Sequence, residues 1–420
     1  MRADGGAAGD PTATARWSLV ALLAAALFIN YVDRGAVPTA AHLIQAELSL
    51  SKPQLGLLLS AFFWSYALLQ IPVGWLAERY GAGRMLAGGL TLWACATMLV
   101  GVAQSFAALL ALRLLLGVGE SVGFPCLSKL LAMTVPVKSL GTANGIVGCA
   151  YLFGPAAGAY GGGLLMAHFG WRSAFWVLGA LSLLWLLPWS RVRLPRHALE
   201  AGSRNSPTFP AILRQTSLWG ASLGHFSTNY TFYFMLTWLP FYLVHERGLS
   251  TAGMASVAGS AYVVNALCAL VAGWATDRFV ARYGRANLAY KSVMITAHVG
   301  SVACMLGMAL GSTAWVFVAI FAYQVLSGIS SPGLFAIGQI LAGPSASARW
   351  IGIQNSMGNL AGMVAPAVAG LLDFKAAFLV AAVVSLLGVA GWAWMIPGVA
   401  PLRWAARAPA PQLEPQRSPS

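Results

Sequence analysis

The feature that most constrains this chain is a series of long apolar runs separated by short polar connectors. A bilayer core about 30 Å thick needs ~20 mostly apolar residues per helix. This template fits the sequence at residues 17–40, 53–76, 84–104, 106–131, 141–167, 172–190, 217–244, 252–275, 289–311, 314–342, 350–372 and 375–396. The sequence therefore predicts an all-α membrane protein with twelve transmembrane helices, and the even number places both termini on the same side of the membrane.

The composition agrees with this prediction. Of the 420 residues, 58% are hydrophobic and only 9% are charged. Soluble globular domains carry about 25% charged residues, so this chain has too little charge to cover a water-facing surface. The five cysteines lie inside apolar runs without CxxC spacing, and the chain contains neither a Walker loop nor an HExxH motif. The sequence therefore predicts no cofactor, no metal site and no enzyme activity.

The charged residues are mostly basic, with 25 Lys and Arg against 11 Asp and Glu. In a soluble protein this excess would suggest nucleic-acid binding, but here the basic residues lie in the connectors. Nineteen of them fall on the side of the termini and four on the other side, while Arg34 and Arg113 lie inside predicted spans. By the positive-inside rule the termini are predicted to be cytoplasmic, and no nucleic-acid partner is expected.

The longest connector, residues 191–216, is basic and polar and separates the spans into six and six. We therefore expect an N-terminal six-helix bundle at 17–190, a cytoplasmic linker at 191–216 and a C-terminal six-helix bundle at 217–396. The flanking tails, 1–16 and 397–420, are rich in Ala, Pro, Ser and charge, a composition typical of disorder.

The two halves contain similar segments in the same order. GWLAER at 74–79 is matched by GWATDR at 273–278, and GTANG at 141–145 is matched, 211 residues later, by GIQNS at 352–356. Such a repeat in a helical membrane protein predicts two bundles related by an axis along the membrane normal. A substrate path between the bundles, with a site near the midplane, is the expected consequence.

The segment GWLAERYGAGR at 74–84 resembles the signature loop of the major facilitator superfamily, G-x-x-x-D-R-x-G-x-x-R, with Glu78 in place of the usual Asp. The resemblance implies the major facilitator fold and a cytoplasmic charge relay that favours one of two transport conformations. The implied gating residues are Gly74, Glu78, Arg79, Gly81, Arg84, Asp277 and Arg278. Because glutamate keeps the negative charge, we expect a changed gating bias and retained function.

Four ionisable residues lie inside the predicted spans: Asp33, Arg34, Arg113 and Glu120. An unpaired charge at bilayer depth costs on the order of 3 kcal/mol by insertion scales, so such residues are functional candidates. Arg113 and Glu120 share one helix face, whereas Asp33 and Arg34 point about 100° apart. The four charges sum to zero, which leaves two interpretations: buried salt bridges, or arginines that bind a substrate carboxylate beside acids that carry protons.

Three segments resemble the anion:cation symporter branch of this superfamily, which includes bacterial sugar-acid permeases and animal sialic acid and vesicular glutamate transporters. They are INYVDR at 29–34, SAFFWSYALLQIPVGW at 60–75 and RLLLGVGES at 113–121. The implied substrate contacts are Tyr31, Arg34 and Tyr66, and the implied proton-coupling residues are Asp33, Glu120 and, as a tuner of Glu120, Arg113. The resemblance also favours Arg34 over Arg113 as the principal carboxylate ligand, which spacing alone leaves open.

Uncharged polar residues on other spans are further candidates. Hydroxyl-bearing substrates need neutral donors and acceptors, and Asn355 occupies the position at which the sugar-acid permeases of this branch have a ligand-binding Asn. Ser331 on the tenth span and Tyr151 on the fifth are also candidates for the substrate site. The alternative is interhelix hydrogen bonding, typically worth ~0.6–2 kcal/mol, which we expect for His225 and His298.

The sequence predicts a secondary transporter that imports a small organic anion, a sugar acid or related carboxylate, together with protons by alternating access. An anion exchanger or facilitator of the same fold is the main alternative, and a receptor built on this fold is more remote. A proton-coupled exporter of drugs is a further alternative, but such a protein should expose an acid in its cavity with no arginine beside it.

Short loops and a high Ala, Gly and Arg content favour a bacterial inner membrane. The expected partners are the anion, protons and the lipid bilayer, and the fold resemblance implies a monomer.

Overall fold

The structure is a computed structural model in which residues 11–194, 207–249 and 251–404 are described, and all regular elements in these ranges are helices. The first half contains α1 (Pro11–Glu47), α2 (Lys52–Tyr80), α3 (Ala82–Val100), α4 (Phe106–Glu120), α5 (Gly123–Thr134), the 3-10 helix Val137–Ser139, α6 (Leu140–Leu184) and α7 (Leu186–Trp189). The short α9 (Phe209–Leu213) precedes the second half, which contains α10 (Thr216–His245), α11 (Thr251–Tyr283), α12 (Ala286–Leu310), α13 (Thr313–Ala342), α14 (Ser347–Gly370) and α15 (Phe374–Trp394). This order accommodates the twelve predicted spans, with α4 and α5 forming one pass.

The predicted span at 141–167 lies within α6, which bends sharply at Gly170, and the span at 172–190 covers the second leg of α6 and α7. Gly170 has a φ of 79° and a ψ of 160°, a backbone conformation that residues with a Cβ rarely adopt. The bend separates a first leg, 140–169, from a second leg, 171–184, and it falls in the connector predicted between residues 167 and 172. Gly81, with a φ of 93°, turns the chain from α2 into α3 in a similar way.

Side-chain caps set the starts of helices at several short connectors. Ser105 Oγ accepts a hydrogen bond from the main-chain N–H of Ala108 (3.2 Å) at the start of α4. Asp373 Oδ1 accepts one from Ala376 (2.7 Å) at the start of α15. Each cap satisfies a main-chain N–H group that the first helical turn leaves without an intrahelical partner. The predicted starts at residues 106 and 375 therefore lie within one residue of those observed.

Nine helices in the described ranges are long and apolar enough to span a membrane by length and composition. The helices α10 and α14 and the first leg of α6 are not among these nine. Their sequences are rich in Gly, Ser, Asn and aromatic residues, as in SLGHFSTNY of α10 and WIGIQNSMGN of α14. Polar residues at bilayer depth are tolerated where they face protein or a cavity. These three helices are therefore the ones that should line an interior site.

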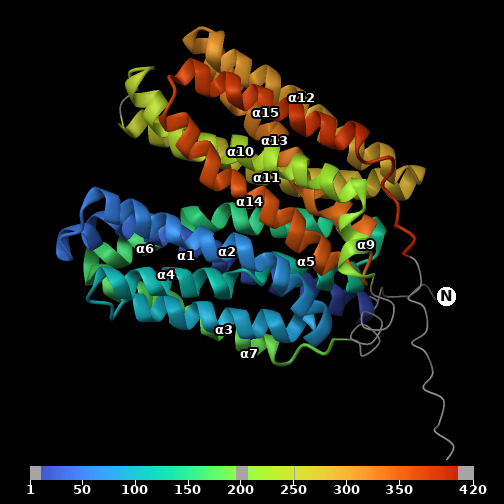
Figure 1. Cartoon of the computed structure of the whole chain (residues 1–420), viewed down its shortest axis with the longest axis horizontal. Helices are drawn as coiled ribbons and strands as arrows, with labels where there is room; N and C mark the ends of the chain where they lie inside the picture. Colours follow the sequence, from blue (N-terminus) through green and yellow to red (C-terminus); the bar gives the residue numbers. More distant parts are fainter. Residues whose placement is uncertain (1–10, 195–206, 250, 405–420) are drawn as a thin grey trace, which may run out of the picture.

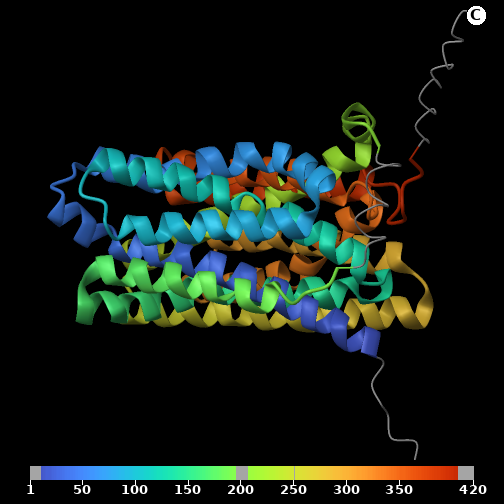
Figure 2. The same cartoon turned by 90° about the horizontal axis from the view of Figure 1, so that it is seen from below.

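The helices form two bundles that lie side by side (Figures 1 and 2). The bundle of α1 to α7 meets the bundle of α10 to α15 where α2 packs on α14 and α6 packs on α11. Glycine makes this approach possible: a Cβ on Gly273 of α11 would lie 2.3 Å from the carbonyl oxygen of Gly141, and Gly74 of α2 lies similarly close to α14. We call this end, which carries residues 74–79 and 273–278, the motif end; in Figure 1 it is at the right, next to α9.

The C-terminal segment is more ordered than the sequence suggests. Leu402 N donates to the carbonyl of Leu341 (2.9 Å), and Trp404 Nε1 donates to that of Ala342 (3.0 Å). Both carbonyls lie at the end of α13, where the last helical turn leaves its acceptors free. Leu402 and Trp404, which lie in the tail predicted from residue 397, therefore bond to the end of α13 in the structure.

The N-terminal tail and the linker contain helical residues that the sequence did not indicate. Helix α1 begins at Pro11, within the tail predicted at 1–16, and the predicted linker at 191–216 contains α9. The remaining parts of these predictions fall at 1–10, 195–206 and 405–420, which lie outside the described residues.

Candidate functional site

A cavity lined by polar and aromatic side chains lies between the two bundles. It is lined by α1, α5, α6, α10, α11, α13 and α14, a set that includes the three helices that are not among the nine membrane-spanning candidates. The lining residues are Tyr31, Phe124, Tyr151, Leu152, His225, Thr228, Asn229, Phe232, Tyr233, Asn265, Ser327, Ser331, Leu334, Phe335, Asn355 and Asn359. Among the predicted substrate-binding residues, the structure thus brings Tyr31, Tyr151, Ser331 and Asn355 together at one cavity.

Arg34 lies behind Tyr31 in a cradle of aromatic rings. Its guanidinium carbon is 4.3 Å from the ring centre of Tyr66, 4.5 Å from that of Tyr31 and 4.8 Å from that of Phe62. Arg34 Nε donates to Glu120 Oε2 at 2.9 Å, while Nη2 is buried without a hydrogen-bond partner among the described residues. A guanidinium carries five N–H donors in a planar fork. The single Nε bond therefore leaves the Nη side of the fork available to a carboxylate.

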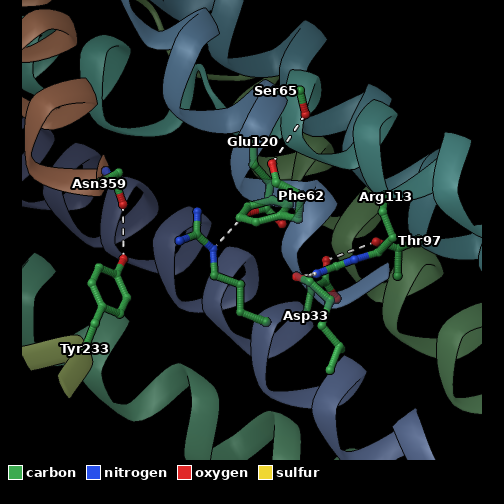
Figure 3. A network of polar contacts seen from close by, with 10 residues as sticks. Asp33, Phe62, Ser65, Thr97, Arg113, Glu120, Tyr233 and Asn359 are labelled. Atoms are coloured by element: carbon green, nitrogen blue, oxygen red, sulfur yellow. Dashed lines mark hydrogen bonds and ion pairs between the residues drawn. The ribbon is translucent and has the colours of Figure 1, made fainter. Parts of the chain in front are cut away.

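Asp33, the neighbour of Arg34, contacts a different helix. It is buried, and its Oδ2 accepts a hydrogen bond from Thr97 Oγ1 of α3 at 3.2 Å (Figure 3). Within the described ranges its Oδ1 has no hydrogen-bond partner. Successive helical residues point about 100° apart, which is why Asp33 reaches α3 while Arg34 reaches Glu120 at the end of α4.

Arg113 lies in the same bundle and donates to main-chain oxygens. Its Nε bonds the carbonyl of Leu58 (3.3 Å) and its Nη2 that of Leu59 (3.4 Å), both on α2. Among the four intramembrane charges as described, Arg34 and Glu120 form the one ion pair. The arrangement does not match a quartet of buried salt bridges. Any tuning of Glu120 by Arg113 would act through space, and it stays a prediction.

The polar cavity residues are held by hydrogen bonds, some of which cross the bundle interface. The hydroxyls of Tyr151 on α6 and Ser331 on α13 are 3.0 Å apart. Asn355 Nδ2 on α14 donates to Gln70 Oε1 on α2 at 2.6 Å. These bonds tie candidate substrate-binding residues to the contacts that hold the two bundles together.

Sequence reasoning did not single out two further features of the cavity. The hydroxyl of Tyr233 on α10 donates to Asn359 Oδ1 on α14 at 3.0 Å (Figure 3). Phe124 stacks on Phe335 across the bundle interface, with ring centres 4.8 Å apart. The signal for Tyr233 was its hydroxyl between two phenylalanines on a span that carries several polar residues. The pairing of Phe124 with Phe335 has no local signal.

At the motif end, an acid of each bundle caps a helix of the other bundle. Glu78 of α2 accepts from the main-chain N–H of Arg349 (3.2 Å) in the first turn of α14 and forms an ion pair with its side chain. Asp277 of α11 accepts from the N–H groups of Gly141 (2.9 Å) and Thr142 (2.5 Å) in the first turn of α6. Carboxylates at helix starts satisfy free N–H groups and complement the helix dipole. The two repeat copies therefore close the motif end by equivalent contacts.

The predicted gating arginines do not take part in this closure. The guanidinium groups of Arg79 and Arg278 each lie over a neighbouring tryptophan ring, at 5.2 and 5.5 Å, and Arg84 is exposed. Within the described ranges none of the three forms an ion pair; Arg349 provides the cation instead. The available signal for Arg349 was its place just before the GIQNS copy of the repeat.

At the opposite end the hydrogen bonds of Glu47 stay within the first bundle, and those of Arg247 stay within the second. Glu47 accepts hydrogen bonds from Trp171 Nε1 (2.6 Å) and Arg172 Nη2 (2.7 Å). These bonds from Trp171 and Arg172 lower the pKa of the Glu47 carboxyl. Among the described residues, the hydrogen bonds that join the bundles lie at the cavity or at the motif end. The conformation is therefore the one with a closed motif end.

Two helical bundles, a polar cavity between them and paired contacts that close one end define a multi-pass membrane transporter of the alternating-access class. Comparison with known proteins agrees. The chain belongs to the Major Facilitator Superfamily, whose profile matches residues 23–366. The fold predicted from the motif at 74–84 is thereby confirmed.

Several relatives of known sequence or structure are similar over most of the chain. The probable sulfoacetate transporter SauU of Cupriavidus necator is 30% identical, with 85% of this chain and 87% of that protein covered. The hexuronate transporter of Bacillus subtilis is 27% identical, with 84% and 88% covered. The crystal structure of the human organic anion transporter MFSD10 matches with a TM-score of 0.74 and 17% identity, over 91% of this chain and 100% of that chain. At this identity the structural likeness shows the fold.

Proposed function

We propose that this protein imports a small organic anion, a sugar acid or related carboxylate, together with protons. The observation that carries the proposal is the guanidinium of Arg34, which packs on the ring of the cavity residue Tyr31 and, among the described residues, is bonded to Glu120 through Nε alone. A carboxylate can bind the free Nη side of such a fork with charge-assisted hydrogen bonds. The relatives named as sulfoacetate and hexuronate transporters have anionic substrates, which supports an anion here.

Proton coupling would follow from the pairing of Arg34 with Glu120. A substrate carboxylate that accepts hydrogen bonds from Arg34 competes with Glu120 for the positive charge of Arg34. A buried carboxylate without a full counter-charge is costly, and binding a proton removes that cost. Asp33 is buried with one hydrogen bond from Thr97 and provides a second group that can carry a proton.

The inward direction would follow from the driving forces, an inward proton gradient and the membrane potential, and the orientation of the chain indicates which end faces the cytoplasm. The positive-inside rule favours a cytoplasmic motif end, so the described conformation would be closed toward the cytoplasm of a bacterial cell and receive substrate from outside. Each net positive charge that moves inward contributes about 2.3 kcal/mol per 100 mV. Uptake of a monoanion gains from the membrane potential when more than one proton accompanies it, which requires both Asp33 and Glu120 to titrate.

The test is the pH outside proteoliposomes after addition of D-glucuronate, D-galactonate, D-glucarate or sulfoacetate. We expect alkalinisation with at least one of these anions, and none with Asp33→Asn or Glu120→Gln. Arg34→Ala should abolish both uptake and the pH signal, and full uptake by this variant would refute Arg34 as the carboxylate ligand. Glu47→Gln is the matched control, because Glu47 is an exposed acid at the far end of the first bundle and its loss should leave the signal intact.

The alternative is anion exchange without protons. Glu120 and Asp33 already accept hydrogen bonds, from Arg34 and Thr97, that a purely structural acid would also accept. Uptake of a labelled anion by the parent without a pH change, and equally by Glu120→Gln, would establish exchange or facilitated diffusion. Counterflow that survives in Glu120→Gln while accumulation against a gradient is lost would instead support proton coupling.

A further inference from the structure

The internal repeat places Asn144 and Asn355 at equivalent positions, 211 residues apart in GTANG and GIQNS. Each asparagine is bonded to a glutamine of the opposite bundle. Asn144 of α6 pairs with Gln339 of α13, and Asn355 of α14 pairs with Gln70 of α2. All four side chains are buried. Two amide pairs therefore cross the bundle interface, one for each copy of the repeat.

The two amide pairs differ in their hydrogen bonding. Asn144 Nδ2 donates to Gln339 Oε1 (2.7 Å), and Gln339 Nε2 donates back to Asn144 Oδ1 (3.2 Å) and to Ser128 (3.3 Å). Asn355 Nδ2 donates to Gln70 Oε1 (2.6 Å), but Gln70 Nε2 is buried with no partner in the described part of the chain. A buried donor without a partner is unfavourable. The Asn144 pair is therefore reciprocal, whereas the Asn355 pair depends on one bond.

The pairs also differ in their access to the cavity. Asn355 lines the cavity, whereas Asn144, Gln339 and Gln70 do not. A molecule in the cavity can reach the carboxamide of Asn355 and compete for its hydrogen bonds. The Asn144 pair is beyond its reach. The main chain at Asn355 is also held from the cavity side, because Asn359 Nδ2 donates to its carbonyl oxygen at 2.7 Å.

We propose that Gln70 is a positioning residue that couples occupancy of the cavity to closure of the motif end. In the described conformation Gln70 holds Asn355 across the interface. A substrate hydroxyl or carboxylate oxygen that accepts the hydrogen bond of Asn355 Nδ2 replaces Gln70 Oε1, and the closed state loses one of its bonds. The inference takes the nature of the ligand from the proposed function. The hydrogen bond between Gln70 and Asn355 is independent of that function.

The main-chain N–H groups of Gly141, Thr142 and Arg349 report directly on the closed end, because acids of the opposite bundle accept their hydrogen bonds. Their hydrogen–deuterium exchange can be followed in the full chain in lipid nanodiscs, with and without each anion of the panel. Without ligand, we expect Gln70→Leu to exchange about fivefold faster than the parent at these positions, the change expected for one neutral hydrogen bond. An anion that is transported should speed exchange in the parent and add nothing in Gln70→Leu.

Gln339→Leu is the matched control, because it makes the same change in the amide pair that the cavity does not reach. It should speed exchange without ligand and keep the response to a transported anion. Asn355→Leu removes the other partner of the Gln70 bond, and the double variant should exchange no faster than Gln70→Leu, as expected for two partners of one bond. Unchanged exchange at 106–116 of α4 shows that each variant is folded.

Parent-like exchange in ligand-free Gln70→Leu and Asn355→Leu would overturn the proposal, whatever the anions do. A Gln70→Leu variant that is faster without ligand but still responds to a transported anion as the parent does would also overturn it. If Gln70→Leu is faster but the parent responds to no anion of the panel, the coupling to substrate is refuted. The proposed function is decided separately, by uptake and pH change in proteoliposomes, and the bond across the interface is retained whichever way that test turns out.

Discussion

Arg34 is held by three aromatic rings and by one bond to Glu120. A lysine ammonium offers three donors from a single point and cannot both keep this bond and present a planar edge to a carboxylate. Because hydrogen bonds to charged groups contribute about 1.5–3 kcal/mol, we expect Arg34→Lys to lower the initial rate of uptake about tenfold or more. Arg282→Lys makes the same change at an exposed position in the last turn of α11 and is the control. Equal uptake by Arg34→Lys and the parent would show that a point charge suffices.

The contribution of Glu47 to the stability of the protein should depend on pH. The hydrogen bonds from Trp171 and Arg172 lower the pKa of its carboxyl below the usual 4.5. A lowered pKa in the folded state means that the contact stabilises the protein above pH 4.5 and is lost as the pH falls below that value. We expect Glu47→Gln to lower the Tm slightly at neutral pH, with the difference from the parent vanishing in acid. A difference that is constant across pH would contradict this account in thermal-unfolding scans.

At the scale of helices, the crossing of α11 and α6 depends on the absence of a side chain at Gly273. A Cβ there would lie 2.3 Å from the carbonyl oxygen of Gly141, so Gly273→Val should keep the motif end from closing. We expect faster deuterium exchange at Gly141 and Thr142 and a loss of uptake, with unchanged helix content by circular dichroism. Gly259→Val on the same helix is the control, because a Cβ there meets no atom within 4 Å. Normal uptake by Gly273→Val would refute the requirement for close packing.

Most helix boundaries could be predicted because their determinants are local. Apolar length and caps place α13 at Thr313–Ala342 against a predicted 314–342, and α15 at Phe374–Trp394 against 375–396. The first helix differs most, because it runs from Pro11 to Glu47. Hydropathy reports burial in the bilayer, whereas a helix continues into water as long as its main chain stays hydrogen-bonded.

The candidate site could be predicted only in part. The motif and the intramembrane position identified Arg34, Glu120 and Glu78, and helical periodicity predicted that Asp33 and Arg34 diverge. The partners across the bundle interface had no local signal, because Glu78 and Arg349 are 271 residues apart and Gln70 and Asn355 are 285 apart. Such pairs form only when the two repeats pack together, which is a property of tertiary structure.

At the scale of the whole molecule, closure of the motif end depends on two contacts related by the repeat. Glu78 caps α14 and Asp277 caps α6, each from the opposite bundle. Bundles that rock as rigid bodies have one equilibrium between closed and open motif ends, and each contact favours the closed state. The free energies of two contacts with no shared partner should add.

Because of this additivity, the effect of removing both acids can be calculated from the effects of removing each one. Each acid accepts hydrogen bonds that contribute about 1.5–3 kcal/mol, so Glu78→Gln and Asp277→Asn should each shift the equilibrium toward the open motif end by about tenfold or more. The double variant should shift it by the product of the two single shifts, measured by deuterium exchange at the starts of α6 and α14. Glu47→Gln, which removes an acid from the opposite end, should cause no shift. A double variant no more open than the stronger single variant would mean that the bundles do not move as rigid bodies, because one contact could then open without releasing the other.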